Sequence, residues 1–140
     1  MENKYTLITG CFDIIHAGHI QLIEFAKTKF PRHTLIIAID GNDRVKKAKS
    51  DSRPINDLLD RMYVIESIKG VDSSIPFDSD EDLIEICNAY KPIRIVGGDY
   101  RGINIVGKEH CSAIVYFDRI VGYSTTNIIG KINETSSLNC

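Results

Sequence analysis

The chain has 140 residues, of which 43% are hydrophobic and 26% are charged, and its formal net charge is −2. This length suits one domain with a single core. No apolar segment approaches the roughly 20 residues of a membrane-spanning helix, and a near-neutral charge offers no basic face for a nucleic acid. We therefore expect one domain that binds neither a membrane nor a nucleic acid.

The first residues, MENKY, and the cysteines bear on the compartment and on metals. The start lacks the basic residues and the long apolar stretch of a secretory signal, so we expect a cytoplasmic protein with reduced thiols. No Cys-x-x-Cys pair and no histidine at a zinc-site spacing accompany the cysteines. A structural metal is therefore not expected at the scattered cysteines, which are Cys11, Cys87, Cys111 and Cys140.

An alternation of strand and helix begins at the N-terminus. Residues 5–10 (YTLITG) and 33–40 (HTLIIAID) are short apolar runs rich in β-branched residues, as in strands that are buried on both faces. Between them, residues 19–30 carry apolar side chains at helical spacing and stop before Pro31. The pattern predicts a strand, a helix and a second strand.

The rest of the chain continues this alternation. The expected elements are a helix over residues 56–70 capped by Asn56 and ended by Gly70, an extended piece over 73–77, a helix opened by Ser79, strands over 93–96 and 113–117, and a short helix over 124–132. This order predicts an α/β fold, a Rossmann-like doubly wound sheet of about five parallel strands with helices on both faces. We assign residues 1–133 to this domain and 134–140 to a polar tail.

Glycine-rich and polar segments follow the predicted strands. In a doubly wound sheet the ligand binds beyond the carboxyl ends of the strands, where the strand order reverses. We expect convergence there of the segments Gly10-Cys11-Phe12-Asp13, Asp40-Gly41-Asn42, Gly97-Gly98-Asp99-Tyr100 and the stretch before Ser124.

Two histidines, His16 and His19, flank Gly18 where the first loop becomes a helix. At this spacing the imidazoles share a helix face, beside backbone N–H groups that favour an anion. They could donate hydrogen bonds to a phosphoryl group under attack. From these residues alone three interpretations stay open: a phosphate site, one packing and one capping histidine, or part of a zinc site.

Two later segments carry groups that suit a nucleotide. Gly97-Gly98 would let the backbone approach a base or ribose, and Asp99 could accept a hydrogen bond from it, although the same motif suits a tight turn. Ser124, Thr125 and Thr126 open a helix, where hydroxyl and N–H groups suit the β- and γ-phosphates. Plain capping by Ser124 is the structural alternative.

Several motifs resemble those of a known family. TGCFDIIHAGH resembles the signature of the HxGH nucleotidyltransferase superfamily, whose members join a phosphorylated metabolite to the α-phosphate of ATP or CTP and release pyrophosphate. KSDSRPINDLLDRM, IVGGDY and GYSTTNII are similar, in order and spacing, to the adenylyltransferase domain of bacterial ADP-heptose synthases. The resemblance covers nearly the whole chain and implies adenylyl transfer to heptose 1-phosphate.

The resemblance also implies roles for individual residues. His16 and His19 would contact the triphosphate and stabilise the transition state, while Asp13 and Asp40 would help to bind the acceptor substrate. Lys46 is our first choice for the catalytic lysine that the family aims at the phosphates, because it lies in the basic loop after the second predicted strand. The remaining implied residues bind the nucleotide and are Gly10, Cys11, Phe12, Gly18, Lys49, Arg61, Gly98, Asp99, Tyr100, Ser124, Thr125 and Thr126.

Two of these assignments have structural alternatives. The basic cluster that contains Lys46 and Lys49, and that ends at Arg53, also fits a solvated charge run. Arg61 also fits a helix-surface arginine paired with Asp57.

One departure leaves the nucleotide open. Arg119 stands five residues before Ser124, as in the cytidylyltransferase branch, whereas the other motifs favour the heptose branch. We expect ATP as the preferred nucleotide. The alternative is a CTP-dependent cytidylyltransferase that acts on glycerol 3-phosphate or a similar small phosphorylated alcohol, and the second alternative is a non-catalytic nucleotide-binding module. Mg²⁺ carried by the NTP is the expected cofactor, and the resemblance implies a homodimer.

Overall fold

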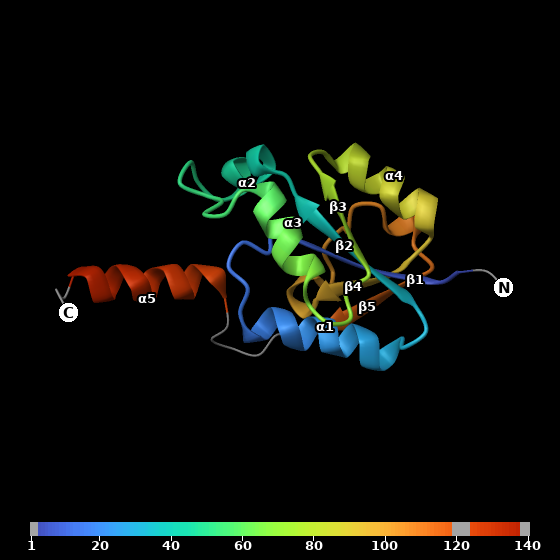
Figure 1. Ribbon diagram of the computed structural model, residues 1–140. Coiled ribbons are helices and arrows are strands. Elements are labelled where there is room, and N and C mark those ends of the chain that lie inside the picture. Colours follow the sequence, from blue (N-terminus) through green and yellow to red (C-terminus); the bar gives the residue numbers. More distant parts are fainter. Residues whose placement is uncertain (1–2, 119–123, 138–140) are drawn as a thin grey trace.

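The computed structural model describes residues 3–118 and 124–137. Within these ranges five strands form one sheet: β1 (Tyr5–Gly10), β2 (Thr34–Asp40), β3 (Ser73–Phe77), β4 (Ile93–Gly97) and β5 (Ala113–Phe117). Neighbouring strands pair in parallel in the order β3-β2-β1-β4-β5 (Figure 1). The predicted α/β fold is confirmed, and the reversal of strand order between β1 and β4 places the expected ligand site at their carboxyl ends.

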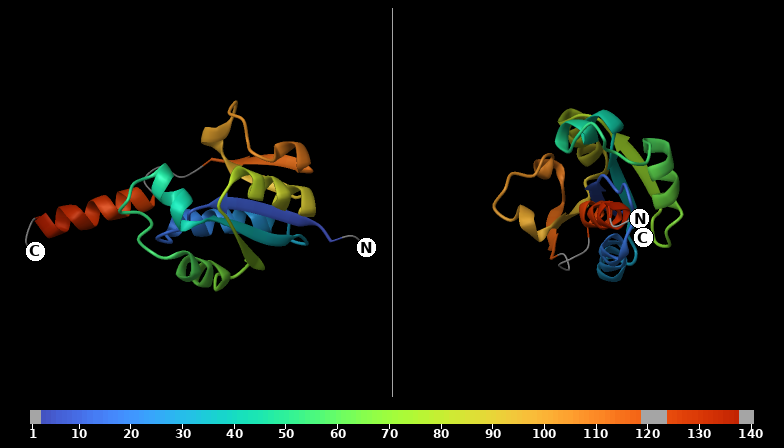
Figure 2. Two further views of the ribbon diagram at one scale, coloured as in Figure 1. Left: turned by 90° about the horizontal axis from the view of Figure 1, so that it is seen from above. Right: turned by 90° about the vertical axis from the view of Figure 1, so that its left-hand side faces the viewer.

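Helices cover both faces of the sheet. The helices of the described residues are α1 (Ala17–Lys29), α2 (Asn42–Ala48), α3 (Leu58–Glu66), α4 (Asp80–Tyr90) and α5 (Thr125–Ser137). Because side chains alternate along a strand, Ile8 and Ile37 pack with α1 and α3, whereas Leu7 and Ile36 pack with α4. Helix α5 extends away from the sheet, and its first turn lies nearest to the body of the molecule (Figure 2).

The basic segment after β2, expected as a loop, forms helix α2. Val45 is 2% exposed, and Arg44 donates from Nε to Asp40 at 2.9 Å and from Nη2 to Asp80 at 3.0 Å. These tertiary contacts stabilise a helix too short to be stable alone. The sequence of this segment, which is rich in cations, gives no local sign of these tertiary contacts.

The helix expected over residues 56–70 is shorter, because Asn56 is bound elsewhere. Its backbone N–H and side-chain amide both donate to Asp13, each at 2.8 Å. Asp57 therefore takes the N-cap position, and the helix ends before Ser67.

The C-terminal helix is longer than expected. Helix α5 runs to Ser137 instead of ending at residue 132, so residues 134–137 of the predicted polar tail are helical. The helix predicted to open at Ser79 is confirmed, since its hydroxyl accepts from the backbone N–H of Asp82 in a capping box.

Candidate active site

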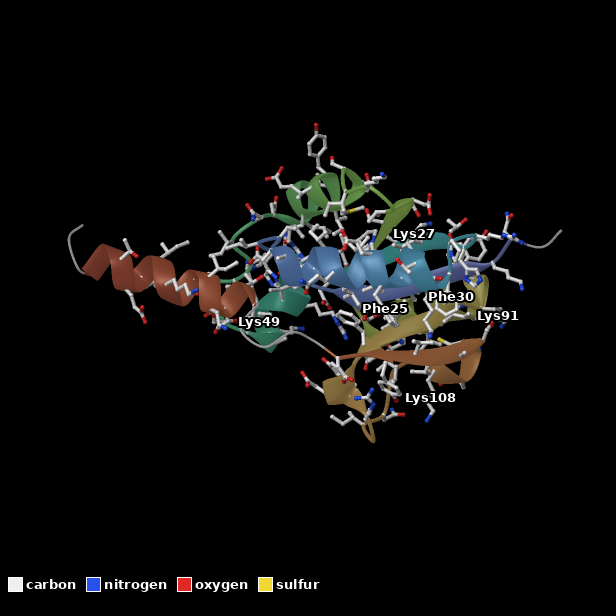
Figure 3. The ribbon with its side chains drawn as sticks, turned by 90° about the horizontal axis from the view of Figure 1, so that it is seen from below. Phe25, Lys27, Phe30, Lys49, Lys91 and Lys108 are labelled. Carbon is white, nitrogen blue, oxygen red and sulfur yellow. The ribbon has the colours of Figure 1, made fainter. Side chains whose placement is uncertain are left out.

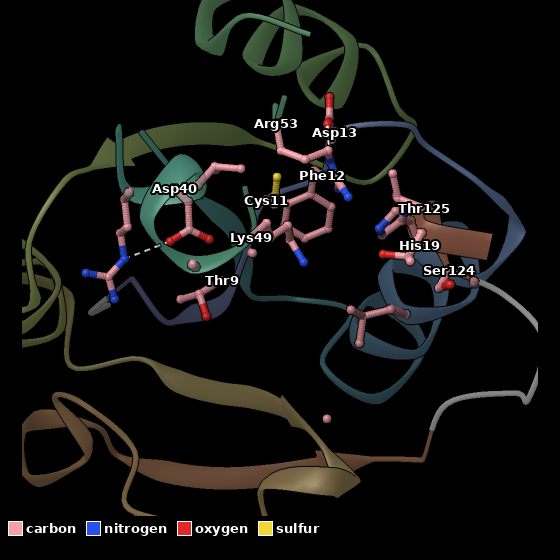
Figure 4. A pocket seen from close by; sticks show the side chains of 18 of the residues that line it. Thr9, Cys11, Phe12, Asp13, His19, Asp40, Lys49, Arg53, Ser124 and Thr125 are labelled. Carbon is pink, nitrogen blue, oxygen red and sulfur yellow. Dashed lines mark hydrogen bonds and ion pairs between the residues drawn. The ribbon is translucent and has the colours of Figure 1, made fainter. Parts of the chain in front are cut away.

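A cavity of about 1420 Å³ opens at the carboxyl ends of the strands (Figure 4). It is lined by strand ends: Thr9 and Gly10 of β1, Asp40 of β2, Gly97 of β4 and Phe117 of β5. Ligand pockets typically measure roughly 300–1,000 Å³. This cavity therefore has room for a nucleotide and a second substrate.

Most of the predicted site residues share this cavity. Those that line it are Gly10, Cys11, Phe12, Asp13, His16, Gly18, His19, Asp40, Lys49, Asp99, Tyr100, Ser124, Thr125 and Thr126. Lys46, Arg61 and Gly98 do not line it.

The two histidines build the start of α1 together. Nδ1 of His16 accepts from the N–H of Gly18 at 3.1 Å, and Nδ1 of His19 accepts from the N–H of His16 at 3.2 Å. These bonds form a capping box made of imidazoles. Because each Nδ1 is an acceptor, the proton of each neutral ring lies on Nε2. Each imidazole can therefore cap the helix through Nδ1 and donate a hydrogen bond through Nε2.

Both imidazoles are neutral at pH 7. Burial lowers the pKa of His16, and burial together with the neighbouring His16 lowers the pKa of His19 to about 4. The two rings stack with their centroids 3.9 Å apart, and an added charge on either ring would disfavour a charge on the other. The pair offers hydrogen-bond donors without a formal positive charge.

Phe12 shapes the loop between β1 and α1. Its φ of 50° lies in the left-handed region, and its ring centroid lies 5.1 Å from that of His19. A Cβ on Gly10 would lie 3.0 Å from Cε2 of Phe12, so glycine gives this ring its space. Burial raises the pKa of the adjacent Cys11 thiol, which lines the cavity in its neutral form.

Asp13 does not offer its carboxylate to the cavity. Its side chain is 0% exposed, and Oδ2 accepts from Nε of Arg53 at 3.2 Å and from the N–H of Ile55 at 2.7 Å. Oδ1 accepts from the N–H of Asn56 at 2.8 Å. Asp13 thus holds the segment between α2 and α3, through which its predicted part in acceptor binding would act.

Arg61 is a buried structural residue. It is 1% exposed, and its guanidinium donates to the backbone oxygens of Cys11, Asp40 and Asn56 and to the side-chain oxygen of Asn42, at 2.8–3.0 Å. Both earlier interpretations are therefore wrong: Arg61 neither faces the phosphate site nor pairs with Asp57 on the surface. It ties the ends of β1 and β2 to the start of α2.

The lysines at the end of α2 differ in whether they line the cavity. All three are exposed, but Lys47 and Lys49 line the cavity and Lys46 does not. Each residue turns a helix by about 100°, so neighbouring lysines point in different directions. Lys49 lies at the end of the molecule from which α5 extends, while Lys27, Lys91 and Lys108 lie toward the other end (Figure 3). Lys47 and Lys49 replace Lys46 as the candidates for contact with phosphate.

Asp40 lies at the end of β2 with its carboxylate partly occupied. Oδ1 accepts from Nε of Arg44 at 2.9 Å. Burial raises the pKa of Asp40, and Arg44 opposes that shift. The side chain is 23% exposed, and its role toward an acceptor stays a prediction.

The Gly98-Asp99-Tyr100 segment forms a 3₁₀ turn after β4. Asp99 and Tyr100 line the cavity. Gly98 is not among the lining residues. A Cβ there would lie 2.0 Å from Oδ1 of Asp118, so its missing side chain makes room for that carboxylate, which accepts from Arg101 at 2.6 Å. A contact of Gly98 with the nucleotide stays a prediction.

The first residues of α5 contribute hydroxyl groups to the cavity. Oγ of Ser124 accepts from the N–H of Asn127 at 3.0 Å, which caps the helix, and the Thr125 hydroxyl donates to the carbonyl of Ile14 at 3.0 Å. The Thr125 bond joins α5 to the loop that carries the histidines, and Figure 4 shows His19 beside Ser124 and Thr125. The first turn of a helix leaves N–H groups without intrahelical acceptors, so it favours an anion there.

Arg53 is a cavity residue that sequence reasoning noted only as the end of the basic cluster. It is 9% exposed and lines the cavity. Its burial depends on Asp13, 40 residues earlier, and no local signal marks it. Arg119, the residue that suggested a cytidylyltransferase, lies outside the described residues.

Neither a metal centre nor a membrane span is found in the described ranges. Among residues 3–118 and 124–137, no three His, Cys, Asp or Glu side chains gather closely enough to hold a metal ion. No helix in that part of the chain has the length and apolar character needed to cross a membrane.

Most of the chain matches one known family. Residues 7–131 match the family described as cytidylyltransferase-like, and the chain belongs to this family. It is a nucleotidyltransferase of the HxGH type, with the motif at His16–His19.

Two relatives and one solved structure are similar to the chain. It is 36% identical over 140 residues to the bifunctional protein HldE of Aliarcobacter butzleri and 38% identical over 135 residues to that of Haemophilus influenzae. These matches cover 99% and 92% of this chain but only 29% and 28% of the relatives, so the chain spans less than a third of their length. A lipopolysaccharide core biosynthesis protein of Thermoplasma volcanium shares the fold, with a TM-score of 0.67, 22% identity, and coverage of 84% of this chain and 98% of that one.

Proposed function

We propose that this chain transfers the adenylyl group of ATP to the phosphate of a heptose 1-phosphate-like sugar and releases pyrophosphate. The observation that carries this proposal is the pair of neutral imidazoles, His16 and His19, beside the first turn of α5 in one cavity. Support for the acceptor comes from the KSDSRPINDLLDRM and STTNII stretches and from the similarity to the HldE proteins.

The reaction needs little covalent help from the protein. An oxygen of the acceptor phosphate attacks the α-phosphorus in line, and the bond from that phosphorus to the bridging oxygen breaks, so that pyrophosphate leaves. The acceptor phosphate is already ionised at neutral pH and needs no general base. Catalysis is positioning and stabilisation of the charge that develops on the phosphoryl oxygens.

Each group in the cavity has a part in this scheme. The Nε2–H groups of His16 and His19 would donate to phosphoryl oxygens, while the N–H groups at the start of α5 would hold the departing β- and γ-phosphates. Lys47 and Lys49 would offset the negative charge of the triphosphate.

Magnesium fits this scheme as an ion that is bound to the nucleotide. The described residues offer no cluster of metal ligands, so Mg²⁺ would be held by triphosphate oxygens and water, where it supplies neutralisation of charge. The homodimer implied by the resemblance stays a prediction.

A nucleotide-by-acceptor assay of pyrophosphate release tests the proposal. ATP with heptose 1-phosphate is expected to give the fastest turnover, and CTP with glycerol 3-phosphate little or none. The reverse ranking would establish the cytidylyltransferase alternative. Binding of ATP by calorimetry without pyrophosphate release from any pair would instead establish a non-catalytic nucleotide-binding module.

A further inference from the structure

Arg53 is held in the cavity by a carboxylate that no solvent reaches. Its Nε donates to Oδ2 of Asp13 at 3.2 Å, and the two side chains are 10% and 0% exposed. The backbone N–H groups of Ile55 and Asn56 fix Asp13 in turn. The guanidinium is therefore placed by the fold, and it would lose little freedom on binding a ligand.

Only one of the three nitrogens of this guanidinium is used. Among the described residues, Nε of Arg53 has a partner, whereas Nη1 and Nη2 have none. Arg53 lines the cavity, and Figure 4 shows it there beside Asp13 and Phe12. Two parallel N–H donors on a fixed plane match the oxygens of a phosphate and bind them in a bidentate manner.

The reaction requires two anionic groups in this cavity, and they must lie on different sides of the α-phosphorus. In-line attack puts the acceptor phosphate opposite the departing pyrophosphate. The histidines and the start of α5 are adjacent and form one anion-binding wall, since Thr125 bonds to the loop before α1. Arg53 belongs to a different segment, between α2 and α3, and so suits the second anion.

We propose that Arg53 binds the phosphate of the acceptor sugar phosphate and aims it at the α-phosphorus. The assignment rests on the proposed function, and it adds a residue that determines specificity for a phosphorylated acceptor. Asp13 is then a positioning residue: it orients Arg53 and holds the segment that carries it.

The test compares Arg53→Gln, Arg53→Lys and the control Arg32→Gln in the pyrophosphate assay with ATP and heptose 1-phosphate. Arg32 is exposed and lies in the turn before β2, at the amino end of the sheet. Arg53→Gln is expected to raise the KM for the sugar phosphate by about 10- to 100-fold, as for loss of charged hydrogen bonds, and to leave the KM for ATP within about twofold. Arg53→Lys keeps the charge but not the fork, so its KM for the acceptor is expected to fall in between.

Inorganic phosphate provides a probe that does not depend on turnover. It is expected to compete with the sugar phosphate rather than with ATP, and calorimetry of the wild type and Arg53→Gln should show weaker phosphate binding in the variant. Thermal unfolding of each variant identifies loss of structure. If Arg53→Gln does not fold, a folded Arg53→Lys with a normal KM for the acceptor overturns the proposal.

The two proposals fail in different ways. A wild-type chain without pyrophosphate release from ATP and heptose 1-phosphate would refute the proposed function. An active wild type in which Arg53→Gln raises the KM for ATP, or changes neither KM, would refute the assignment of Arg53 alone.

Discussion

The start of α1 and the segment between α2 and α3 both line the cavity, but their contacts differ in range. At the start of α1, the hydrogen bonds that orient the histidines join residues two and three positions apart. In the other segment, the bonds from Asp13 reach residues 40, 42 and 43 positions away. A local motif thus carries the donors proposed for catalysis, whereas long-range packing places Arg53. Substitutions at the start of α1 should therefore lower turnover, whereas substitutions among the long-range contacts should change stability or substrate binding.

The largest expected effect is on turnover at the start of α1. His16→Asn and His19→Asn keep side-chain oxygens that can accept the capping bonds, but their shorter amides do not reach the positions of the imidazole Nε2–H donors. Each is expected to lower kcat by about 100- to 1,000-fold, as for loss of a donor to a developing oxyanion, with a much smaller change in nucleotide binding. Steady-state pyrophosphate release and ATP calorimetry measure the two effects. The control is His110→Gln, outside the cavity, and near-normal turnover in both cavity variants would contradict the assignment.

Substitution of Arg61, in contrast to substitution of the histidines, should mainly lower the stability of the folded chain. Arg61→Met removes the donor from the partly buried acceptors of four hydrogen bonds, and we expect a loss of about 4 kcal/mol in the free energy of unfolding. Urea unfolding measures it. Arg101→Met, in which an exposed ion pair is lost, is the matched control, and equal midpoints for the two variants would show that the Arg61 contacts add no stability.

The pH dependence of stability tests the burial of His19. Its pKa is about 4 in the folded chain, below the usual unfolded value of about 6.5. Above pH 6.5 the imidazole is neutral in both states and costs nothing. As the pH falls from 6.5 to 4, only the unfolded state gains the proton, so stability falls by up to about 3 kcal/mol. His19→Gln should lose less stability over that window, and identical pH profiles for the variant and the wild type would contradict the shifted pKa.

The smallest expected effect distinguishes the lysines of the basic segment. Lys47→Gln and Lys49→Gln are expected to raise the KM for ATP by about threefold, and the effect should shrink in high salt because exposed charges are screened. Lys46→Gln should leave the KM unchanged within error, because Lys46 does not line the cavity. A larger effect at Lys46 than at Lys47 and Lys49 would reverse the correction made from the structure.

Much of the fold could be predicted because its signals are local. The strands over 5–10 and 113–117 follow from apolar, β-branched runs, and Ser79 marked its helix by a capping pattern. Helix α2 was missed because Val45 and Arg44 stabilise it through contacts outside the segment. Gly98 was assigned to the nucleotide because a glycine that approaches a ligand and one that makes room for Asp118 look alike in a sequence.

The sequence alone determined the family, through motifs that resemble it. The sequence also determined most of the order of strands and helices and the pair of histidines at a helix start, because these depend on short spacings and on hydrophobic periodicity. The tertiary structure decided which cations reach the cavity. In the folded chain Arg61 is buried among carbonyl groups, Lys46 does not line the cavity, and Arg53 is bonded to Asp13. Whether an arginine binds a ligand or the protein depends on which acceptors the folded chain brings within about 3 Å of it, and residue spacing carries no record of those distances.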